Sequence, residues 1–238
     1  MAKKIVIASG KGGVGKSTVT VGLGMALTQL GKKVLLIDCD TLRSLDILTG
    51  AAEKIVYDWG DVMLGRCKAQ EAIYSAMGMS LMTCPKTYKG VSLKNMALLI
   101  KLVENDYDYI LLDSPAGIEI GFILASFVAD RGLVVSTPDS VCVRSVCTTA
   151  DEMSKYNVKD IRLIINRADK KNIKKNLMLN IDSVIDMTQV QLIGLVPEDE
   201  KIRHSSMKGT IYKKGQISYD AFNNIAARIE GKNIPLEV

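Results

Sequence analysis

The sequence has no long run of apolar residues. Its longest runs, such as Val34–Ile37 and Ile110–Leu112, fall far short of the roughly 20 residues that a membrane-spanning helix needs. The amino-terminus, Met-Ala-Lys-Lys-Ile, leads directly into a predicted strand, so we expect no signal peptide. These absences argue against an integral membrane protein and against a secreted one.

The sequence also has few cysteines, a single histidine and a small net charge. The five cysteines are scattered and lack C-x-x-C spacing, which is typical of a reducing compartment, and we expect a cytoplasmic protein. The net charge of +5 comes from dispersed Lys and Arg residues and is weak evidence for binding to nucleic acid or to an anionic membrane. The single histidine, His204, is predicted to lie on the surface, and Trp59, the single tryptophan, to be partly buried.

What the sequence does contain is a regular alternation of apolar, β-branched runs with amphipathic stretches. This alternation predicts one α/β domain over residues 1–238, with a mostly parallel sheet and helices on both faces. No linker, repeat or low-complexity run interrupts it. The predicted strands are Lys4–Ala8, Lys33–Asp38, Met79–Thr83, Tyr109–Asp113, Arg131–Ser136, Ile161–Asn166 and Gln191–Val196. The predicted helices cover residues 17–30, 45–50, 68–77, 92–104, 119–128, 140–155, 173–187 and 217–230.

A glycine-rich loop follows the first predicted strand. Residues 10–18 read GKGGVGKST, which matches the phosphate-loop pattern G-x-x-x-x-G-K-[ST]. Its glycines let the backbone turn N–H groups onto phosphates, Lys16 is a charge for the β- and γ-phosphates, and the Ser17 hydroxyl is a Mg²⁺ ligand. The helix that follows adds the positive end of its dipole. We therefore expect a nucleoside triphosphate to contact Gly10, Lys11, Gly12, Gly13, Val14, Gly15, Lys16, Ser17 and Thr18.

Carboxylates follow two other predicted strands. Asp113 ends one of them, and Asp38 ends another, with Asp40 two residues later. Ligands of such folds bind outside the carboxyl ends of the strands, so Asp38 and Asp113 are candidate Mg²⁺ ligands, direct or through water. A strand-end cap is the alternative role for Asp38. No His or Glu beside the loop is an obvious strong base, which suits phosphoryl transfer by positioning and charge, at a slow intrinsic rate.

These motifs resemble the MinD/ParA family of deviant Walker-A ATPases, which are SIMIBI-type P-loop NTPases, and within it the branch of the septum site-determining MinD proteins. The resemblance covers nearly the whole chain. It rests on GKGGVGKST (10–18), DCDTLRSLD (38–46), YDWGDVMLG (57–65), LLDSPAGIE (111–119), STPDSVCVR (136–144), IINR (164–167) and GLVPED (194–199). We call residues Asp38–Asp46 the switch segment.

The resemblance implies a role for each matching residue. Lys11, Lys16 and Asp40 would be the catalytic residues: Lys11 reaches across a dimer interface to the partner's nucleotide, and Asp40 positions the hydrolytic water. Ser17, Asp38 and Asp113 would hold Mg²⁺, and Thr18 would contact the α-phosphate. The adenine would lie against Asn166, Arg167, Pro197, Glu198 and Asp199.

The resemblance also implies a function and partners. We expect a slow ATPase that dimerises with ATP in division-site selection, with a MinC-like inhibitor and a MinE-like or other activator. Ser145 stands where the family usually has an acidic residue, so these partner contacts are expected to differ. Residues 231–238 do not match a basic amphipathic helix, so binding to an anionic membrane is expected only with a tail beyond Val238.

Three alternatives remain at this point. A ParA-type positioning ATPase would need a basic DNA-binding surface, for which the sequence offers Lys170, Lys171, Lys174 and Lys175. A flagellar-number regulator related to MinD would share the membrane tail and would usually carry an extra amino-terminal segment, which we do not expect here. A metal-insertion ATPase would need cysteine ligands such as Cys142 and Cys147, which lie five residues apart and do not share a helix face well.

Overall fold

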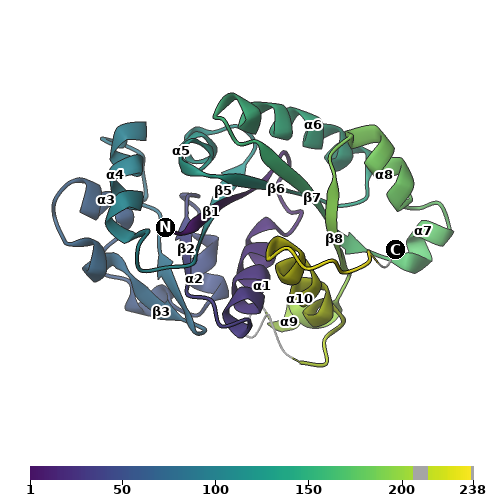
Figure 1. Cartoon of the computed structure of the whole chain (residues 1–238), viewed down its shortest axis with the longest axis horizontal. Coiled ribbons are helices and arrows are strands. Elements are labelled where there is room, and N and C mark those ends of the chain that lie inside the picture. Colours follow the sequence, from purple (N-terminus) through teal and green to yellow (C-terminus); the bar gives the residue numbers. More distant parts are fainter. Residues whose placement is uncertain (206–213, 237–238) are drawn as a thin grey trace.

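A twisted sheet of eight strands runs through the part of the chain that the computed structural model describes, residues 1–205 and 214–236 (Figure 1). The strand order is β3-β4-β2-β5-β1-β6-β7-β8, and every neighbouring pair is parallel except β3 with β4. The prediction of a mostly parallel sheet is confirmed. The strands are β1 Lys3–Ser9, β2 Val34–Asp38, β3 Tyr74–Ala76, β4 Met79–Met82, β5 Tyr109–Ala116, β6 Arg131–Ser136, β7 Asp160–Ala168 and β8 Leu192–Pro197.

Helices cover both faces of this sheet. Helices α4, α5 and α6 lie above it in Figure 1, and α1 and α10 lie below it. Because successive side chains of a strand point to opposite faces, β1 places Val6 and Ala8 in one core and Ile5 and Ile7 in the other. The helices are α1 Lys16–Gln29, α2 Ser44–Leu48, α3 Trp59–Met63, α4 Leu93–Val103, α5 Ile120–Val128, α6 Ser140–Lys155, α7 Lys170–Lys174, α8 Ile181–Thr188, α9 Glu200–Ser205 and α10 Ile217–Ile229, with 3-10 turns η1 Ala52–Lys54 and η2 Ala69–Ala72.

The predicted helix over residues 68–77 is wrong. That stretch forms the short turn η2 and then β3, which pairs antiparallel with β4. The two residues between the strands, Met77 and Gly78, have φ angles of 53° and 80°. Two successive positive φ angles are the geometry of a tight hairpin turn, which a helix-period pattern does not reveal.

The predicted helix over residues 173–187 is divided into α7 and α8. Asp169 caps α7 by accepting hydrogen bonds from the backbone N–H groups of Lys171 and Asn172, and Asn180 starts α8 by accepting one from Ser183 at 2.7 Å. The side chain of His204 lies outside the described residues, so the prediction for it stays a prediction. Within the described ranges, no helix combines the length and the apolar character that crossing a bilayer requires.

The amino-terminal edge of the sheet is tied to the end of α10. Glu230 pairs with Lys32 and with Lys3, the latter at 3.1 Å, and accepts a hydrogen bond from the Tyr109 hydroxyl. These partners, Lys32 first, lower the pKa of Glu230 to about 2. The cluster fixes α10 against β1 and β5 at the edge opposite the phosphate loop.

Candidate nucleotide-binding site

The glycine-rich loop joins β1 to α1 and is held in place by a residue of β7. The Nδ2 of Asn166 donates to the carbonyl oxygen of Val14 at 2.7 Å. Gly15 lies at the start of α1 with φ +88°, and a Cβ there would be 2.3 Å from the same Nδ2. Only glycine fits this close approach in a left-handed conformation.

A cavity of about 420 Å³ opens over this loop. A second cavity, of about 120 Å³, adjoins it, since both are lined by Gly15, Thr18 and Arg167. The first gathers the predicted phosphate-contacting residues except Gly10, together with Asp40, and the second gathers the predicted adenine-contacting ones. The first is lined by Ser9, Lys11, Gly12, Gly13, Val14, Gly15, Lys16, Ser17, Thr18, Asp40, Leu42, Ser44, Ile47, Leu48, Ala116 and Arg167, and the second by Gly15, Thr18, Asn166, Arg167, Pro197, Glu198, Asp199 and Ile202.

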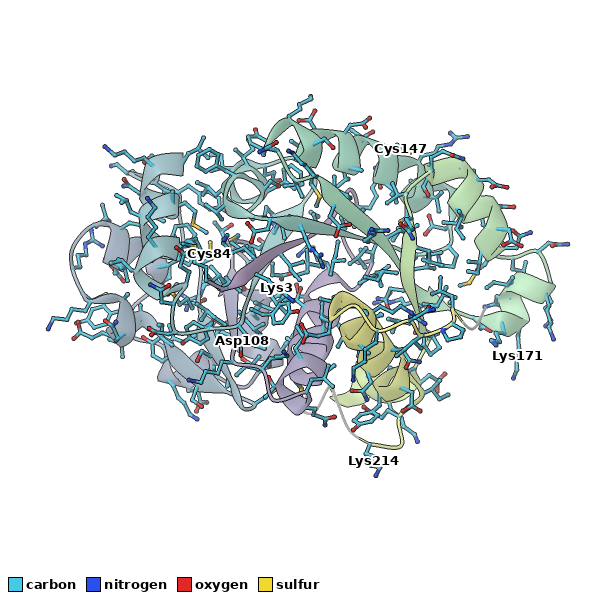
Figure 2. The ribbon with its side chains drawn as sticks, viewed as in Figure 1. Lys3, Cys84, Asp108, Cys147, Lys171 and Lys214 are labelled. Carbon is cyan, nitrogen blue, oxygen red and sulfur yellow. The ribbon has the colours of Figure 1, made fainter. Side chains whose placement is uncertain are left out.

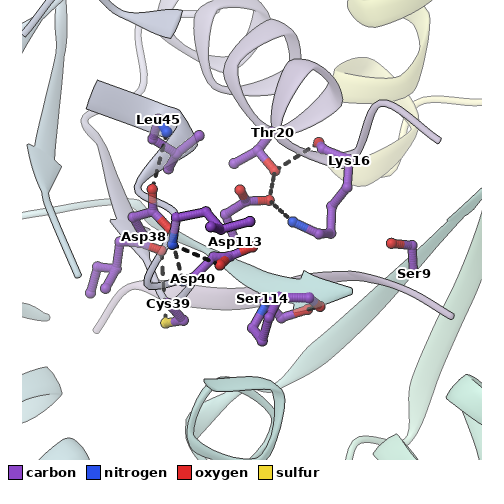
Figure 3. Close-up of polar contacts among 12 residues, drawn as sticks. Ser9, Lys16, Thr20, Asp38, Cys39, Asp40, Leu45, Asp113 and Ser114 are labelled. Carbon is purple, nitrogen blue, oxygen red and sulfur yellow. Dashed lines mark hydrogen bonds and ion pairs between the residues drawn. The ribbon is translucent and has the colours of Figure 1, made fainter. Parts of the chain in front are cut away.

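Two buried carboxylates lie side by side beneath the loop. Asp38 and Asp113 are register partners on β2 and β5, and neither is exposed to solvent. The Nζ of Lys16 lies 3.2 Å from Oδ1 of Asp113, and the Thr20 hydroxyl donates to the same oxygen at 2.8 Å (Figure 3). Lys16 and Thr20 are four residues apart on α1, so they share one helix face.

Asp38 organises the chain that leaves β2. Its Oδ1 accepts a hydrogen bond from the backbone N–H of Asp40 at 2.9 Å, and its Oδ2 accepts one from Leu45 at 3.0 Å (Figure 3). The strand-end cap considered as an alternative is therefore present. Burial, and secondly the nearby charge of Asp113, raise the pKa of Asp38 to about 8.

This carboxylate pair fits a divalent cation. The second oxygen of Asp113, Oδ2, is buried and has no hydrogen-bond partner among the described residues. Two buried carboxylates whose one ion-pair partner among the described residues is Lys16 are electrostatically costly without a further cation. Ser17, which lines the cavity above, adds the hydroxyl oxygen that Mg²⁺ accepts as a ligand.

Lys11 and Asp40 lie at the open side of the larger cavity. The Lys11 side chain is exposed and makes no ion pair within the described part of the chain, while its carbonyl accepts a hydrogen bond from Ser9 Oγ at 3.0 Å. Asp40 is half-buried, and its Oδ1 accepts a hydrogen bond from the Leu42 backbone at 3.0 Å. Both side chains are thus available to a ligand or to another subunit.

The sequence did not single out Thr20, Tyr88 or the contacts of Trp59. Thr20 carries a signal that could have revealed it, since it lies one helical turn after Lys16. Trp59 is fully buried, so the prediction of partial burial is wrong. Its Nε1–H donates to the carbonyl of Asp38 at 2.7 Å, a contact across 21 residues of sequence that no local pattern indicates.

The five cysteines do not gather in one place, although the buried thiols of Cys39 and Cys84 are close enough to interact. Figure 2 shows Cys84 near the left of the fold and Cys147 on α6 at the upper right. Among residues 1–205 and 214–236, no group of three or more His, Cys, Asp or Glu side chains is placed to hold a metal ion. The described structure therefore offers no support for a cysteine-bound metal.

The family description of the CobQ/CobB/MinD/ParA nucleotide-binding domain matches residues 5–211. The chain belongs to this family. It is 37% identical over 244 residues to the septum site-determining protein MinD of Synechocystis, covering 99% of this chain and 92% of that protein. It is also 35% identical to the MinD protein of Bacillus subtilis, covering 100% of this chain and 92% of that one.

Solved structures of MinD proteins share the fold. The MinC:MinD cell division protein complex of Aquifex aeolicus matches with a TM-score of 0.90 and 33% identity, covering 100% of this chain and 99% of that one. MinD of Pyrococcus horikoshii, complexed with Mg-ADP, matches with a TM-score of 0.85 and 27% identity, covering 97% and 96%. These likenesses confirm the predicted single-domain P-loop fold and the resemblance to the MinD branch.

Proposed function

We propose that this chain is a MinD-like, Mg²⁺-dependent ATPase that closes into a two-fold dimer around ATP. The observation that carries the dimer is Lys11, a second lysine of the phosphate loop whose side chain is exposed at the cavity. Lys16 already supplies the buried cation beneath the loop. A lysine in the same loop that turns to solvent is suited to a nucleotide on another subunit.

The residues around Lys11 support an interface. Leu42 and Ile47 line the same cavity and are 78% and 64% exposed. Ile118 and Ile120, which follow β5 on the same edge of the sheet, are also exposed. Exposed apolar residues gathered beside a ligand cavity are typical of an interaction site, and a second copy would cover them.

Each residue of the site has a part in hydrolysis. Lys16 would exchange its ion pair with Asp113 for the β- and γ-phosphates, while Asp38, Asp113 and Ser17 would hold Mg²⁺, which would supply positive charge to the phosphates. Asp40 orients the attacking water. The water oxygen bonds to the γ-phosphorus as the bond to the bridging oxygen breaks, giving ADP and phosphate.

The base side of the site is formed by Asn166, Arg167 and the Pro197–Asp199 segment. Arg167 Nε lies 4.0 Å from Glu198 Oε2, so the two charges frame the smaller cavity. Asp199 accepts a hydrogen bond from Ser218 Oγ at 3.0 Å, which ties this segment to α10. We assign adenine to this cavity and the triphosphate to the larger one.

The cellular role follows from the relatives. Proteins named for septum-site determination align over almost the whole chain, which supports an ATPase in division-site selection. The Aquifex MinC:MinD complex supports a MinC-like partner. The five free cysteines support a reducing compartment, so we assign the chain to the cytoplasm, with membrane association reserved for a chain that continues into an amphipathic tail.

The first test distinguishes the role of Lys11 from that of Lys16. Lys16→Met is expected to weaken Mg-ATP binding by about 10- to 100-fold, because a charge-assisted contact is worth about 1.5–3 kcal/mol. Lys11→Met is expected to leave that affinity within about twofold but to lower kcat by about 10³-fold, the scale of an arginine finger. Isothermal titration calorimetry measures the affinity for Mg-ATP, and the rate of phosphate release gives kcat. Lys101→Met, an exposed lysine on α4, is the matched control for loss of one charge.

Dimerisation is measured by sedimentation with Mg-ATP, using Asp40→Ala to slow hydrolysis. We expect a dimer with ATP, a monomer with ADP, and a monomer for Lys11→Met under both conditions. A protein that stays monomeric while saturated with ATP would contradict the dimer. Equal effects of the Lys11 and Lys16 substitutions on nucleotide affinity would contradict the separate role of Lys11.

A further inference from the structure

Two aromatic side chains hold successive carbonyl groups at the start of the switch segment. Trp59 Nε1–H donates to the Asp38 carbonyl at 2.7 Å, and the Tyr88 hydroxyl donates to the Cys39 carbonyl at 2.5 Å. The two rings stack, with centroids 6.4 Å apart and planes at 29°. Because the rings touch, the two hydrogen bonds are made by one unit, which we call the aromatic clamp (Trp59 and Tyr88).

The clamp binds the chain at the point where the pairing of β2 with β4 ends. The register of β2 with β4 ends at the pair Ile37 and Met82. On the other side, the Cys39 backbone N–H still donates to the Asp113 carbonyl at 2.8 Å. Beyond this point the carbonyls of Asp38 and Cys39 receive their hydrogen bonds from side-chain donors. Burial raises the pKa of the Tyr88 phenol, so its hydroxyl stays a donor.

Trp59 is held in place by burial and by the cap of its own helix. Trp59 is completely buried, and its backbone N–H donates to the Thr83 carbonyl at 3.2 Å. Asp58 and Asp61 cap α3 with reciprocal hydrogen bonds of 3.1 Å, which fixes the helix that begins at Trp59. Tyr88 lies in the loop between β4 and α4, four residues after Cys84, which Figure 2 labels. Packing of this kind around Trp59 is what a residue that positions its neighbours requires.

The clamp also meets the segment that follows β5. A Cβ added at Gly121, near the start of α5, would lie 2.0 Å from the Cys39 carbonyl oxygen and 2.4 Å from the Tyr88 hydroxyl. No side chain fits at Gly121 while Tyr88 is hydrogen-bonded to the Cys39 carbonyl. The first turn of α5 and the switch segment thus approach each other closely at the Cys39 carbonyl.

We propose that Trp59 and Tyr88 are positioning residues for hydrolysis: by fixing the carbonyls of Asp38 and Cys39, they hold Asp40 at the mouth of the phosphate cavity. The inference rests on the proposed ATPase function. The Asp40 N–H is bonded to the Asp38 carboxylate, so a shift of the Asp38 backbone moves both acids. The clamp touches no phosphate-contacting residue of the loop, and its loss should therefore affect turnover more than nucleotide affinity.

The test removes one hydrogen bond at a time: Tyr88→Phe keeps the ring, whereas Trp59→Phe also replaces the buried indole with a smaller ring, so Tyr88→Phe is the decisive variant. For both Tyr88→Phe and Trp59→Phe we expect kcat to fall about three- to tenfold, since one hydrogen bond contributes about 0.5–1.5 kcal/mol, with KM for Mg-ATP within about twofold. The amides of residues 40–45 should exchange with solvent about three- to tenfold faster in the nucleotide-free protein. Tyr74→Phe is the matched control, because its hydroxyl accepts from the backbone N–H groups of Val56 and Tyr57 and lies outside the switch segment.

The double variant supplies a further readout. Since the two rings act on one segment, its loss of kcat should be smaller than the product of the single losses. Unchanged amide exchange over residues 40–45 in both single variants would overturn the clamp, as would an equal loss of kcat in Tyr74→Phe. If exchange responds as expected but the unmodified protein does not hydrolyse ATP, the proposed function fails while the clamp remains as the holder of the switch segment.

Discussion

Replacing Thr20 with valine tests the buried charge cluster beneath the phosphate loop. Thr20 donates to Oδ1 of Asp113 at 2.8 Å, and this carboxylate is fully buried with its other oxygen unpartnered among the described residues. Valine keeps the side-chain volume and removes only the hydroxyl. Asp113 then depends on Lys16 alone.

The magnitude follows from the charge of the acceptor. A hydrogen bond to a charged group contributes about 1.5–3 kcal/mol, more than the 0.5–1.5 kcal/mol or so of a neutral one. We expect Thr20→Val to lower the free energy of unfolding by that larger amount. For a chain of this length each kcal/mol moves the thermal midpoint by about 2–4 °C, so the midpoint should fall by about 3–12 °C.

The assay is urea unfolding without nucleotide and with EDTA, followed by the fluorescence of Trp59, the only tryptophan. Thr28→Val is the matched control. Thr28 lies on the same helix and donates only to the Gly24 carbonyl, at 2.9 Å, so its replacement should change stability by less than about 0.5 kcal/mol. A loss in Thr20→Val no greater than in Thr28→Val would refute the reasoning.

A double-mutant cycle identifies the partner. In the background Asp113→Asn, the acceptor is neutral, so Thr20→Val should cost only about 0.5–1.5 kcal/mol. The expected coupling is thus about 1 kcal/mol or more. An equal cost in both backgrounds would mean that the charge of Asp113 is not what Thr20 stabilises.

Three further predictions concern the loop and the opposite edge of the sheet. Gly10→Ala places a Cβ 2.4 Å from the Ser145 Cβ, so it should weaken Mg-ADP binding at least about tenfold in calorimetry, and Ser145→Gly should restore part of the affinity. In Gly15→Ala the new Cβ would lie 2.3 Å from the Asn166 side chain, at a residue with φ +88°. This variant should lose more than about 1 kcal/mol of stability, seen as a lower thermal midpoint in calorimetry. Glu230 has its pKa lowered from 4.5 to about 2, so its contribution is complete above about pH 4.5 and disappears as the pH falls toward 2. Glu230→Gln should remove that part of the pH dependence, about 0.5–1 kcal/mol in denaturant titrations because solvent screens its partners. An unchanged acid limb in that variant would contradict the assignment.

The strands and the phosphate loop could be predicted because their signals are local. A buried parallel strand is a continuous apolar run, and the loop needs its glycines, lysine and serine at fixed spacing. The predicted strand over Arg131–Ser136 agrees with β6 at both ends. The hairpin of β3 with β4 was missed because two residues with positive φ, Met77 and Gly78, decide it, and Met77 is not a residue that indicates such a turn.

The acids at the strand ends show where sequence reasoning reaches its limit. That Asp38 and Asp113 meet could be predicted, because parallel strands bring their carboxyl ends to one edge. Which strands are neighbours, and so which acid pairs with which, follows from the order of the sheet. The ion pair between Lys16 and Asp113 spans 97 residues, and its geometry is a property of the packed core.

By itself, the sequence determined that this protein binds a nucleotide, since the nine residues GKGGVGKST between a strand and a helix contain the groups that bind phosphate. Only the tertiary structure decided what surrounds the nucleotide. The contacts of Thr20 with Asp113, and of Trp59 and Tyr88 with the switch segment, join elements that are far apart in the sequence. The physical reason is that buried carboxylates and carbonyls must find donors, and the folded chain supplies them from whichever side chains its packing brings near.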